Sequence, residues 1–409
     1  MLALLLNAAC GCQQQDRTAS AREQEVQPLV TVRDVRVLIG DRKPTCRLRV
    51  TGPFVIRDHT GQTVLRGDRG DWTSLSVDSS RRLRFGSHTL GPNAYDLVPQ
   101  RDGSIEVSFA KKGGKSAAPR RYAGRLRLSV NASGRPRVIN FVNIETYVAC
   151  VLPGELFPHF EQEAFRAQSV AVRTYVLYQM AQRDHKTYDV AATEASQVYP
   201  GLRTGAVAGR AVEAASFTKG IVASWTSPDG ERLFCTFYSA CCGGRTQDVA
   251  NCRTDPPSIP PLAGGVPCNC PKIATSYRWK AVRMTKDEFT RKIVARYPAM
   301  KNLGRIETVR ATRRTQWSRP ITFRLTGSSG DHRDIRAENL RLALGSRTVR
   351  SSNFTLRTSR NHFEFTNGKG FGHAMGMCQW GMQEMALTGR SAAAILKHYY
   401  PNMNLTRAY

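Results

Sequence analysis

The stretch that decides the fold runs from residue 144 to residue 182 and reads IETYVACVLPGELFPHFEQEAFRAQSVAVRTYVLYQMAQ. Its second half predicts a long helix over residues 161–182, because apolar or small residues recur there at three- and four-residue spacing. These residues are Phe165, Ser169, Val172, Val176 and Met180. The first half predicts a shorter helix over residues 144–152 that stops at Pro153-Gly154, since proline interrupts helical hydrogen bonding. We therefore expect Glu155 in the bend between two helices.

The residues before this stretch predict a different kind of structure. Residues 1–28 are expected to be a signal and a tether, and residues 29–110 a β-rich module of short apolar runs separated by Gly, Asp and Pro. A basic linker rich in Gly, Ser, Ala and Pro follows over residues 111–121. Leu and Arg then alternate ahead of a Ser133-Gly134 turn and a second apolar run, which predicts a hairpin.

Residues 122–409 mix helix and strand patterns and form one expected region. The fold class that we predict is α+β, with a β-rich N-terminal module followed by a mixed α/β region. In this region Glu155 would lie in a turn before a long helix.

The composition limits the partners of the protein. The chain has 409 residues, with 60 Lys and Arg against 32 Asp and Glu, so its formal net charge is +28. Hydrophobic residues make up 41%, which excludes a mostly disordered basic tail. The basic residues are spread along the chain and no common nucleic-acid-binding module occurs, so we expect no nucleic-acid partner. A diffuse positive charge suits an anionic wall polymer or a membrane surface.

The N-terminal residues indicate export. The apolar run Met1–Leu6 is too short to span a membrane, and small residues precede Cys10 and Cys12. This pattern is similar to the signal of bacterial lipoproteins, in which a cysteine receives a lipid anchor. An ordinary frayed N-terminus is the alternative. On the first interpretation the protein is exported and lies in the periplasm or on the cell envelope.

The cysteines favour an oxidising compartment. The chain has 11 of them, a high number for a reducing cytosol. Six lie close together in the sequence: Cys235, Cys241, Cys242, Cys252, Cys268 and Cys270. Disulfides, a bound metal and free thiols are the three interpretations, and the missing C-x₂₋₄-C spacing counts against zinc. We expect at least two disulfides within Cys235–Cys270, with the adjacent Cys241 and Cys242 bonded to different partners.

Several motifs, in a fixed order, carry a family resemblance. They are Tyr147-Val148-x-x-Val151-Leu152-Pro153-Gly154-Glu155, Gln168-Ser169-Val170-Ala171-Val172-Arg173-Thr174-Tyr175, Gln197-Val198-Tyr199, Phe237-Tyr238-Ser239-Ala240-Cys241-Cys242-Gly243-Gly244 and Gly372-His373-x-x-Gly376-Met377-x-Gln379-x-Gly381. In these motifs the chain resembles the stage II sporulation protein D / amidase enhancer (SpoIID/LytB) family. The resemblance implies a peptidoglycan lytic transglycosylase, which cleaves the bond between N-acetylmuramic acid (MurNAc) and N-acetylglucosamine (GlcNAc) and leaves a 1,6-anhydro ring.

The resemblance implies that Glu155 is the catalytic residue. In this reaction the 6-hydroxyl of the sugar is the nucleophile, so one carboxyl suffices to protonate the leaving oxygen and later accept the hydroxyl proton. Such an acid needs a raised pKa, and we expect desolvation by Leu152, Leu156 and Phe157 to supply it. A carboxylate that only complements a helix dipole is the alternative role of Glu155.

The same motifs imply a set of substrate-binding residues. They are Arg173, Gln168, Tyr238, Ser239, His373 and Gln379. Several of them also have a structural alternative. Arg173 is then a solvated arginine, and Gln168 forms helix-packing hydrogen bonds. The hydroxyls of Tyr238 and Ser239 then bind backbone groups at a strand end, and His373 is a buried histidine that ties a loop to the core. Trp380 is interpreted either as a platform for a sugar ring or as core packing.

No cofactor is expected. Some enzymes of the family hold zinc with an upstream His and Cys and with a His-Cys pair just ahead of Gln-Val-Tyr. This chain has Ala195-Ser196 in place of the pair, and only His185 stands near the upstream position. We therefore predict that this zinc is missing.

Two functions stay open at this point. The first is the lytic transglycosylase, whose partner is the peptidoglycan glycan strand. The second is a non-catalytic enhancer that binds peptidoglycan and presents it to a wall amidase. Loss of Glu155 would abolish the first function and spare the second.

Overall fold

The fold is described by a computed structural model over residues 32–68, 70–110, 117–275 and 277–409. It is an α+β structure, as predicted, with 26% of residues in helices and 34% in strands. In this part of the chain, we find no helix whose length and apolar character would let it cross a membrane. The expected lipid-anchor cysteines Cys10 and Cys12, the tether and most of the basic linker lie outside the described residues.

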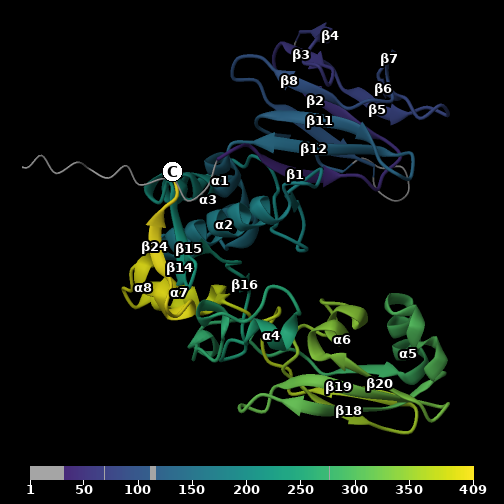
Figure 1. Cartoon of the computed structure of the whole chain (residues 1–409), viewed down its shortest axis with the longest axis vertical. Helices are drawn as coiled ribbons and strands as arrows, with labels where there is room; N and C mark the ends of the chain where they lie inside the picture. The colour runs from purple at the N-terminus through teal and green to yellow at the C-terminus, as the bar shows by residue number, and fades with distance from the viewer. Residues whose placement is uncertain (1–31, 69, 111–116, 276) are drawn as a thin grey trace, which may run out of the picture.

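Two β-sheets form the front of the molecule, at the top of Figure 1. A seven-stranded sheet has the order β13-β1-β12-β11-β8-β3-β4, and a six-stranded sheet has the order β10-β9-β2-β5-β6-β7. The strands are β1 (Val35–Gly40), β2 (Cys46–Val50), β3 (Phe54–Arg57), β4 (Thr63–Gly67), β5 (Thr73–Val77), β6 (Leu83–Phe85), β7 (His88–Gly91), β8 (Tyr95–Pro99), β9 (Ile105–Phe109), β10 (Arg120–Tyr122), β11 (Arg125–Val130), β12 (Pro136–Val142) and β13 (Val190–Ala191).

The predicted hairpin is confirmed as the antiparallel pair β11 and β12. Leu126 and Leu128 are fully buried while Arg125 and Arg127 stay partly exposed, so the Leu/Arg alternation marks the two faces of a strand. β11 also pairs with β8, and β12 pairs with β1. Hydrogen bonding of the front sheets therefore continues beyond the predicted linker, up to the start of the first helix. The division of the chain into domains stays a prediction.

The middle of the molecule contains α1, α2, α3, α7, α8 and the end of the chain, as Figure 1 shows. Its elements are α1 (Ile144–Glu155), α2 (Gln162–Gln182), α3 (Ala206–Phe217), β14 (Ile221–Ser227), β15 (Gly230–Leu233), β16 (Tyr238–Ser239), α4 (Val249–Cys252), η1 (Pro260–Leu262), η2 (Cys270–Lys272), β23 (Met377–Cys378), α7 (Gln379–Leu387), α8 (Ala392–Tyr399) and β24 (Asn404–Arg407). α2 packs against α1, α3, α7, α8 and β14, so it is the central helix of this region.

The predicted end of the first helix is wrong. α1 continues through Pro153 and ends at Glu155, and the Leu156 N–H closes the last turn on the Leu152 carbonyl at 2.9 Å. Proline removes its own N–H donor to the carbonyl four residues earlier, but the residues after it can keep helical geometry, as the Leu156 N–H bond to Leu152 shows. Glu155 is thus the last residue of a helix rather than part of a free bend.

Residues 279–368 form an insert with a hydrophobic core of its own. The chain enters and leaves it side by side: Arg278 is bridged to Lys369, and the Trp279 N–H donates to the Gly368 carbonyl at 3.1 Å. The elements are β17 (Val282–Thr285), α5 (Lys286–Arg296), η3 (Pro298–Leu303), β18 (Ile306–Arg314), β19 (Pro320–Gly327), β20 (His332–Arg336), α6 (Ala337–Leu344), β21 (Thr355–Thr358) and β22 (His362–Thr366). The sequence patterns alone did not separate this unit from the rest of residues 122–409.

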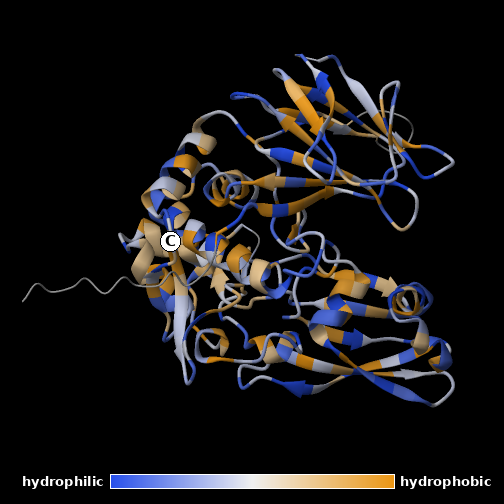
Figure 2. Ribbon diagram, turned by 45° about the horizontal axis from the view of Figure 1, so that its top comes forward, coloured by the Kyte–Doolittle hydropathy of each residue, from blue (hydrophilic) through white to orange (hydrophobic). Residues whose placement is uncertain are grey.

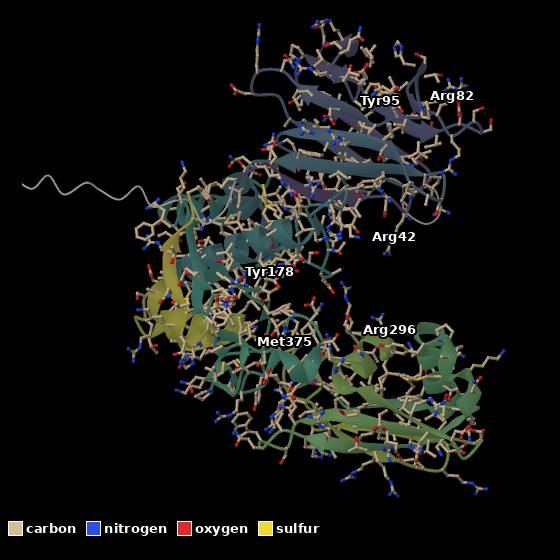
Figure 3. The ribbon with its side chains drawn as sticks, in the orientation of Figure 1. Arg42, Arg82, Tyr95, Tyr178, Arg296 and Met375 are labelled. Carbon is tan, nitrogen blue, oxygen red and sulfur yellow. The ribbon has the colours of Figure 1, made fainter. Side chains whose placement is uncertain are left out.

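Polarity follows this architecture. Apolar residues alternate with polar ones along the strands of the front sheets and of the insert in Figure 2, as sheets with one buried face require. Basic side chains project from both parts: Arg42 and Arg82 from the front sheets and Arg296 from α5 are exposed in Figure 3. The net positive charge is therefore spread over the surface.

Candidate active site

Glu155 is held where the end of α1 meets the segment Gln197–Tyr199. Its Oε1 accepts a hydrogen bond from the Val198 N–H at 2.6 Å. The preceding Gly154 permits this approach, because a Cβ at that position would lie 2.7 Å from the Val198 carbonyl oxygen. The Pro-Gly-Glu sequence therefore places a carboxyl at a close backbone contact that a larger residue would prevent.

A parallel strand pair brings two further predicted residues to Glu155. β16 pairs with β23, with Tyr238 opposite Met377, and Gln379 follows directly as the first residue of α7. The Gln379 Nε2 donates to the Glu155 carbonyl at 3.2 Å and lies 3.5 Å from its Oε2. Two motifs far apart in the sequence thus converge on one carboxyl.

The environment raises the pKa of Glu155. Burial is the main cause, and the negative charge of Glu194 adds to it, while hydrogen bonds from Val198 and Gln379 and the nearby Tyr238 hydroxyl oppose the shift. Among the described residues Glu155 forms no ion pair. By contrast, the half-buried Glu145 is also desolvated, but the hydrogen bond and charge of Arg173, together with hydrogen bonds from Tyr409 and Gly220, outweigh this and lower the pKa of Glu145. One carboxyl therefore favours the protonated state and the other the ionised state.

Buried hydroxyl and amide groups surround this carboxyl. The Tyr147 hydroxyl donates to Gln197 Oε1 at 2.9 Å. In the described part of the chain, the Tyr238 hydroxyl and Gln197 Nε2 have no hydrogen-bond partner. Burial, together with the charge of Glu155, raises the pKa of Tyr238 far above its usual range, so this hydroxyl stays protonated. An unpartnered donor beside an acid can bind an oxygen of a ligand.

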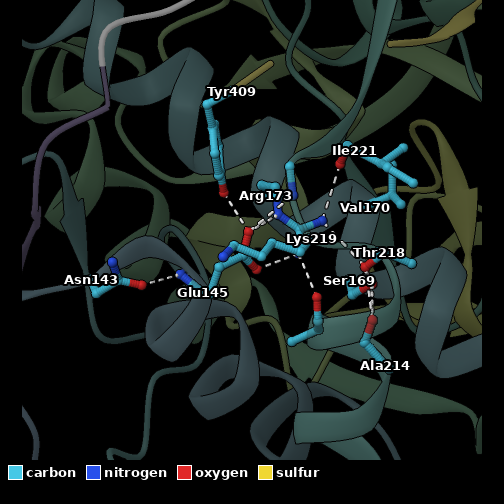
Figure 4. Close-up of polar contacts among 12 residues, drawn as sticks. Asn143, Glu145, Ser169, Val170, Arg173, Ala214, Thr218, Lys219, Ile221 and Tyr409 are labelled. Atoms are coloured by element: carbon cyan, nitrogen blue, oxygen red, sulfur yellow. Dashed lines mark hydrogen bonds and ion pairs between the residues drawn. The ribbon is translucent and has the colours of Figure 1, made fainter. Parts of the chain in front are cut away.

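Arg173 does not contact the candidate site. Its side chain is fully buried, and two of its nitrogens donate to the carboxylate of Glu145 at 3.0 and 2.6 Å (Figure 4). Further bonds reach the carbonyls of Ala215 and Ile221. Tyr409 also donates to Glu145. With every direction occupied, Arg173 ties α2 to α1 and to the chain end, so its predicted contact with substrate is corrected to a structural role.

The remaining predicted residues divide between packing and the site. Gln168 is fully buried in α2, and neither of its amide atoms has a partner among the described residues. Ser239 is buried beside Gly372. A side chain at position 372 would place its Cβ 2.7 Å from the Ser239 Cβ, so the two segments are in close contact. Burial lowers the pKa of His373 to about 4, and its Nδ1 accepts from the Met375 N–H at 3.0 Å. His373 is therefore a neutral imidazole that also fixes its own loop.

Comparison with known proteins gives the relationship of the chain. The profile of the stage II sporulation protein domain (SpoIID) matches residues 132–225, which include Glu155, and a domain of unknown function (DUF8618) matches residues 269–376. The Stage II sporulation protein D of Bacillus amyloliquefaciens is 28% identical over 65% of this chain and 75% of its own length. These matches support the resemblance of the chain to the SpoIID/LytB family.

Other relatives extend this result. An uncharacterized protein of Brachyspira hyodysenteriae is 27% identical to this chain, and the match covers 91% of the chain and 92% of that protein. The Amidase enhancer of Bacillus subtilis is 26% identical over 82% of the chain and 53% of its own length. These names support a function related to the cell wall.

An aromatic cluster lies next to Glu155. Trp380 is buried and packs on Phe157 and Phe160, with ring centroids 5.5 and 5.2 Å apart. Core packing, one of its two expected roles, is thus observed for Trp380. Phe157 is 50% exposed and stacks on His159, so the exposed aromatic face belongs to a residue that was predicted only as an apolar wall. Its position two residues after Glu155 was the sequence signal for an exposed ring beside this carboxyl.

The expected disulfides are not formed among the cysteines that the structure describes. The nine cysteines that the structure describes are free and buried. Cys270 Sγ lies 3.6 Å from Cys241 Sγ and 3.7 Å from Cys242 Sγ, well beyond a bonded pair. Instead of forming bonded pairs, the sulfurs of Cys242, Cys268, Cys270 and Cys378 lie together as one group. Cys378 follows the insert in the sequence and was not part of the predicted cluster. Two residues occupy the positions at which some enzymes of the family were said to hold zinc. The Ser196 hydroxyl accepts a hydrogen bond from the Ala191 N–H, and His185 is exposed.

Proposed function

We propose that this protein is a peptidoglycan lytic transglycosylase that cleaves the MurNAc–GlcNAc glycosidic bond and leaves 1,6-anhydro-MurNAc ends. The observation that carries the proposal is the state of Glu155. Its carboxyl is desolvated and has no cationic partner among the described residues, and both conditions favour the protonated acid. The Val198 N–H opposes this shift but fixes the orientation of the carboxyl.

The reaction needs one acid that later acts as a base. Protonated Glu155 gives its proton to the glycosidic oxygen as the bond to C1 breaks and positive charge develops on the sugar. The 6-hydroxyl of the same sugar then bonds to C1 and returns its proton to Glu155, so no water is consumed. The Tyr238 hydroxyl and the Gln379 amide lie beside the carboxyl and are the groups that we assign to orienting it and the glycan.

A second catalytic carboxylate is not required in this scheme. Glu194 influences Glu155 through its charge, yet its side chain is exposed and forms an ion pair with Arg347 at 3.2 Å. Glu194 is therefore oriented toward Arg347 in the solvent rather than hydrogen-bonded at the Glu155 carboxyl. This arrangement supports an intramolecular nucleophile over hydrolysis.

The test is the product. Purified protein is incubated with sacculi that carry stem peptides and with glycan strands stripped of them, and the soluble fragments are analysed by mass spectrometry. We expect anhydro-muramyl ends from the wild type, none from Glu155→Gln, and a normal yield from Glu213→Gln. Glu213 is a matched control, because it is a surface carboxylate of α3 paired with Arg166. Reducing muramyl ends in place of anhydro ends would contradict the proposal.

The second candidate is an amidase enhancer, which the name of the Bacillus subtilis relative favours. An enhancer would bind peptidoglycan and stimulate a wall amidase without cleaving glycan. Stimulation that survives in Glu155→Gln, with no anhydro product from the wild type, would select this function.

We also propose that the protein is exported and acts in the periplasm or at the cell envelope, because its proposed substrate is the wall. The experiment is cell fractionation of the full chain, with a labelled fatty acid to test lipid attachment at Cys10 or Cys12. Recovery of the protein in the cytosol alone would refute this location.

A further inference from the structure

Four buried thiols converge on one point outside the catalytic machinery. The Sγ atoms of Cys242, Cys268, Cys270 and Cys378 all lie within 4.8 Å of one another, and all four residues are buried. They come from three segments: the turn after β16, the stretch around η2, and the end of β23. A buried group of four protonated thiols would leave most of its hydrogen-bonding capacity unused, which is unfavourable.

We propose that these four cysteines bind one structural zinc ion. Tetrahedral zinc bonds thiolate sulfur at about 2.3 Å, which sets the sulfurs about 3.8 Å apart. The Cys242 and Cys270 sulfurs are 3.7 Å apart. A disulfide would need about 2.05 Å. An iron–sulfur cluster would spread its ligands around a core of several atoms, so the compact set favours a single ion.

Hydrogen bonds to the sulfurs support a thiolate centre. Cys378 Sγ accepts from the Cys242 N–H at 3.2 Å and from the Gly381 N–H at 3.4 Å. The Tyr399 hydroxyl lies 3.1 Å from Cys268 Sγ. Gly381 is needed at this place, since a Cβ there would lie 2.3 Å from that sulfur. Such donors orient metal-bound thiolates and spread their charge.

A buried arginine supplies a further observation. Arg319, from the turn before β19, is only 6% exposed and donates to the Cys242 carbonyl. No described carboxylate forms an ion pair with it. A buried guanidinium without an anion is costly. Four thiolates with one Zn²⁺ carry a net charge of −2, and this charge would balance the arginine.

The place of the ion explains what it would do. Cys242 lies in the turn that follows Tyr238-Ser239, and Cys378 directly precedes Gln379. Zinc between them locks the β16–β23 pair that brings Tyr238 and Gln379 to Glu155. With four protein ligands there is no open position for water, so the ion holds the site together and takes no part in the reaction.

The experiment measures metal directly and does not depend on activity. The full chain is produced with zinc supplied, purified without chelator, and analysed by mass spectrometry for metals. We expect about one zinc per chain in the wild type. The same content is expected in Cys46→Ser, a matched control because Cys46 is a buried thiol of β2 outside the cluster. In Cys378→Ser the zinc content should fall well below the wild-type value.

A second measurement covers a variant that fails to fold. Cobalt is exchanged into the wild-type protein, and its absorption spectrum is recorded. Thiolate-to-cobalt charge-transfer bands with tetrahedral d–d bands are expected. The proposal is overturned by a zinc-free wild type without these bands, by iron in stoichiometric amount, or by a disulfide between any two of the four cysteines in peptide mapping.

Discussion

Replacing Glu155 with glutamine tests the catalytic assignment most directly. The amide has the size of the carboxyl and keeps one oxygen. This oxygen can still accept the hydrogen bond that the Val198 N–H donates to Glu155 Oε1 at 2.6 Å in the wild type. It cannot donate a proton to a leaving oxygen as an acid does. General acid–base groups contribute roughly 10²–10⁴-fold, so we expect the formation of anhydro ends to fall by that factor. This corresponds to a barrier increase of about 3–5 kcal/mol.

The same substitution has a predictable effect on stability. The folded-state pKa of Glu155 is raised by burial, so the folded protein holds this proton more tightly than the unfolded chain. Wild-type stability therefore falls as pH rises from the unfolded pKa, about 4.3, through the raised folded pKa. The amide of the Glu155→Gln variant does not titrate. The free energy of unfolding of this variant, relative to wild type, should increase across this pH window and stay higher above it.

Two assays check these expectations. Anhydro-muramyl ends are counted by mass spectrometry over time, and urea denaturation is followed on the acidic and the neutral side of the window, with Glu213→Gln as control. A well-folded Glu155→Gln that releases anhydro ends at the wild-type rate would refute the assignment. A variant less stable than wild type at neutral pH would refute the electrostatic reasoning.

Three further predictions concern charged residues. Arg173→Ala should cost about 3–5 kcal/mol in urea denaturation, because it leaves the carboxylate of Glu145 without its buried partner, and an unchanged midpoint would contradict the structural role. Glu194→Gln removes a charge that raises the pKa of Glu155, so the alkaline limb of the pH–rate profile should move to lower pH; a limb that stays in place would show that this charge is screened. Binding to isolated wall material should weaken with added salt, since a net charge of +28 acts mainly over a Debye length of about 10 Å at 0.1 M, and cosedimentation that ignores salt would exclude this attraction.

The local patterns in the sequence were sufficient for much of the fold. The helix predicted over residues 161–182 is α2, with Glu161 as its N-cap, and the Leu/Arg alternation is β11. Such features depend on residues a few positions apart, so periodicity reports them. The end of α1 was predicted too early, because proline removes one hydrogen bond to the preceding turn but does not prevent the residues after it from being helical.

The candidate site was predictable in part and for a different reason. Glu155 and Gln379 came from motif resemblance, and the structure brings them together. The role of Arg173 was not predictable, since its partner Glu145 lies on another helix and no spacing rule connects them. The thiol set was missed because Cys378 stands on the far side of the insert from Cys270. Contacts between distant segments leave no periodic signal.

The neighbouring ends of the insert have a consequence for how this chain folds. Joining two cysteines across a long flexible loop costs an entropy that grows with the logarithm of loop length. Here the loop between Cys270 and Cys378 is a folded body with its own core, and its entry and exit strands are already bonded at Trp279 and Gly368. Once this body forms, the two thiols are separated by short tethers only. We therefore expect the folded insert to hold Cys270 and Cys378 close together, so that their contact no longer depends on closing a long flexible loop. Substitutions that destabilise the core of the insert should slow the folding of the Glu155 site, although Glu155 lies outside the insert.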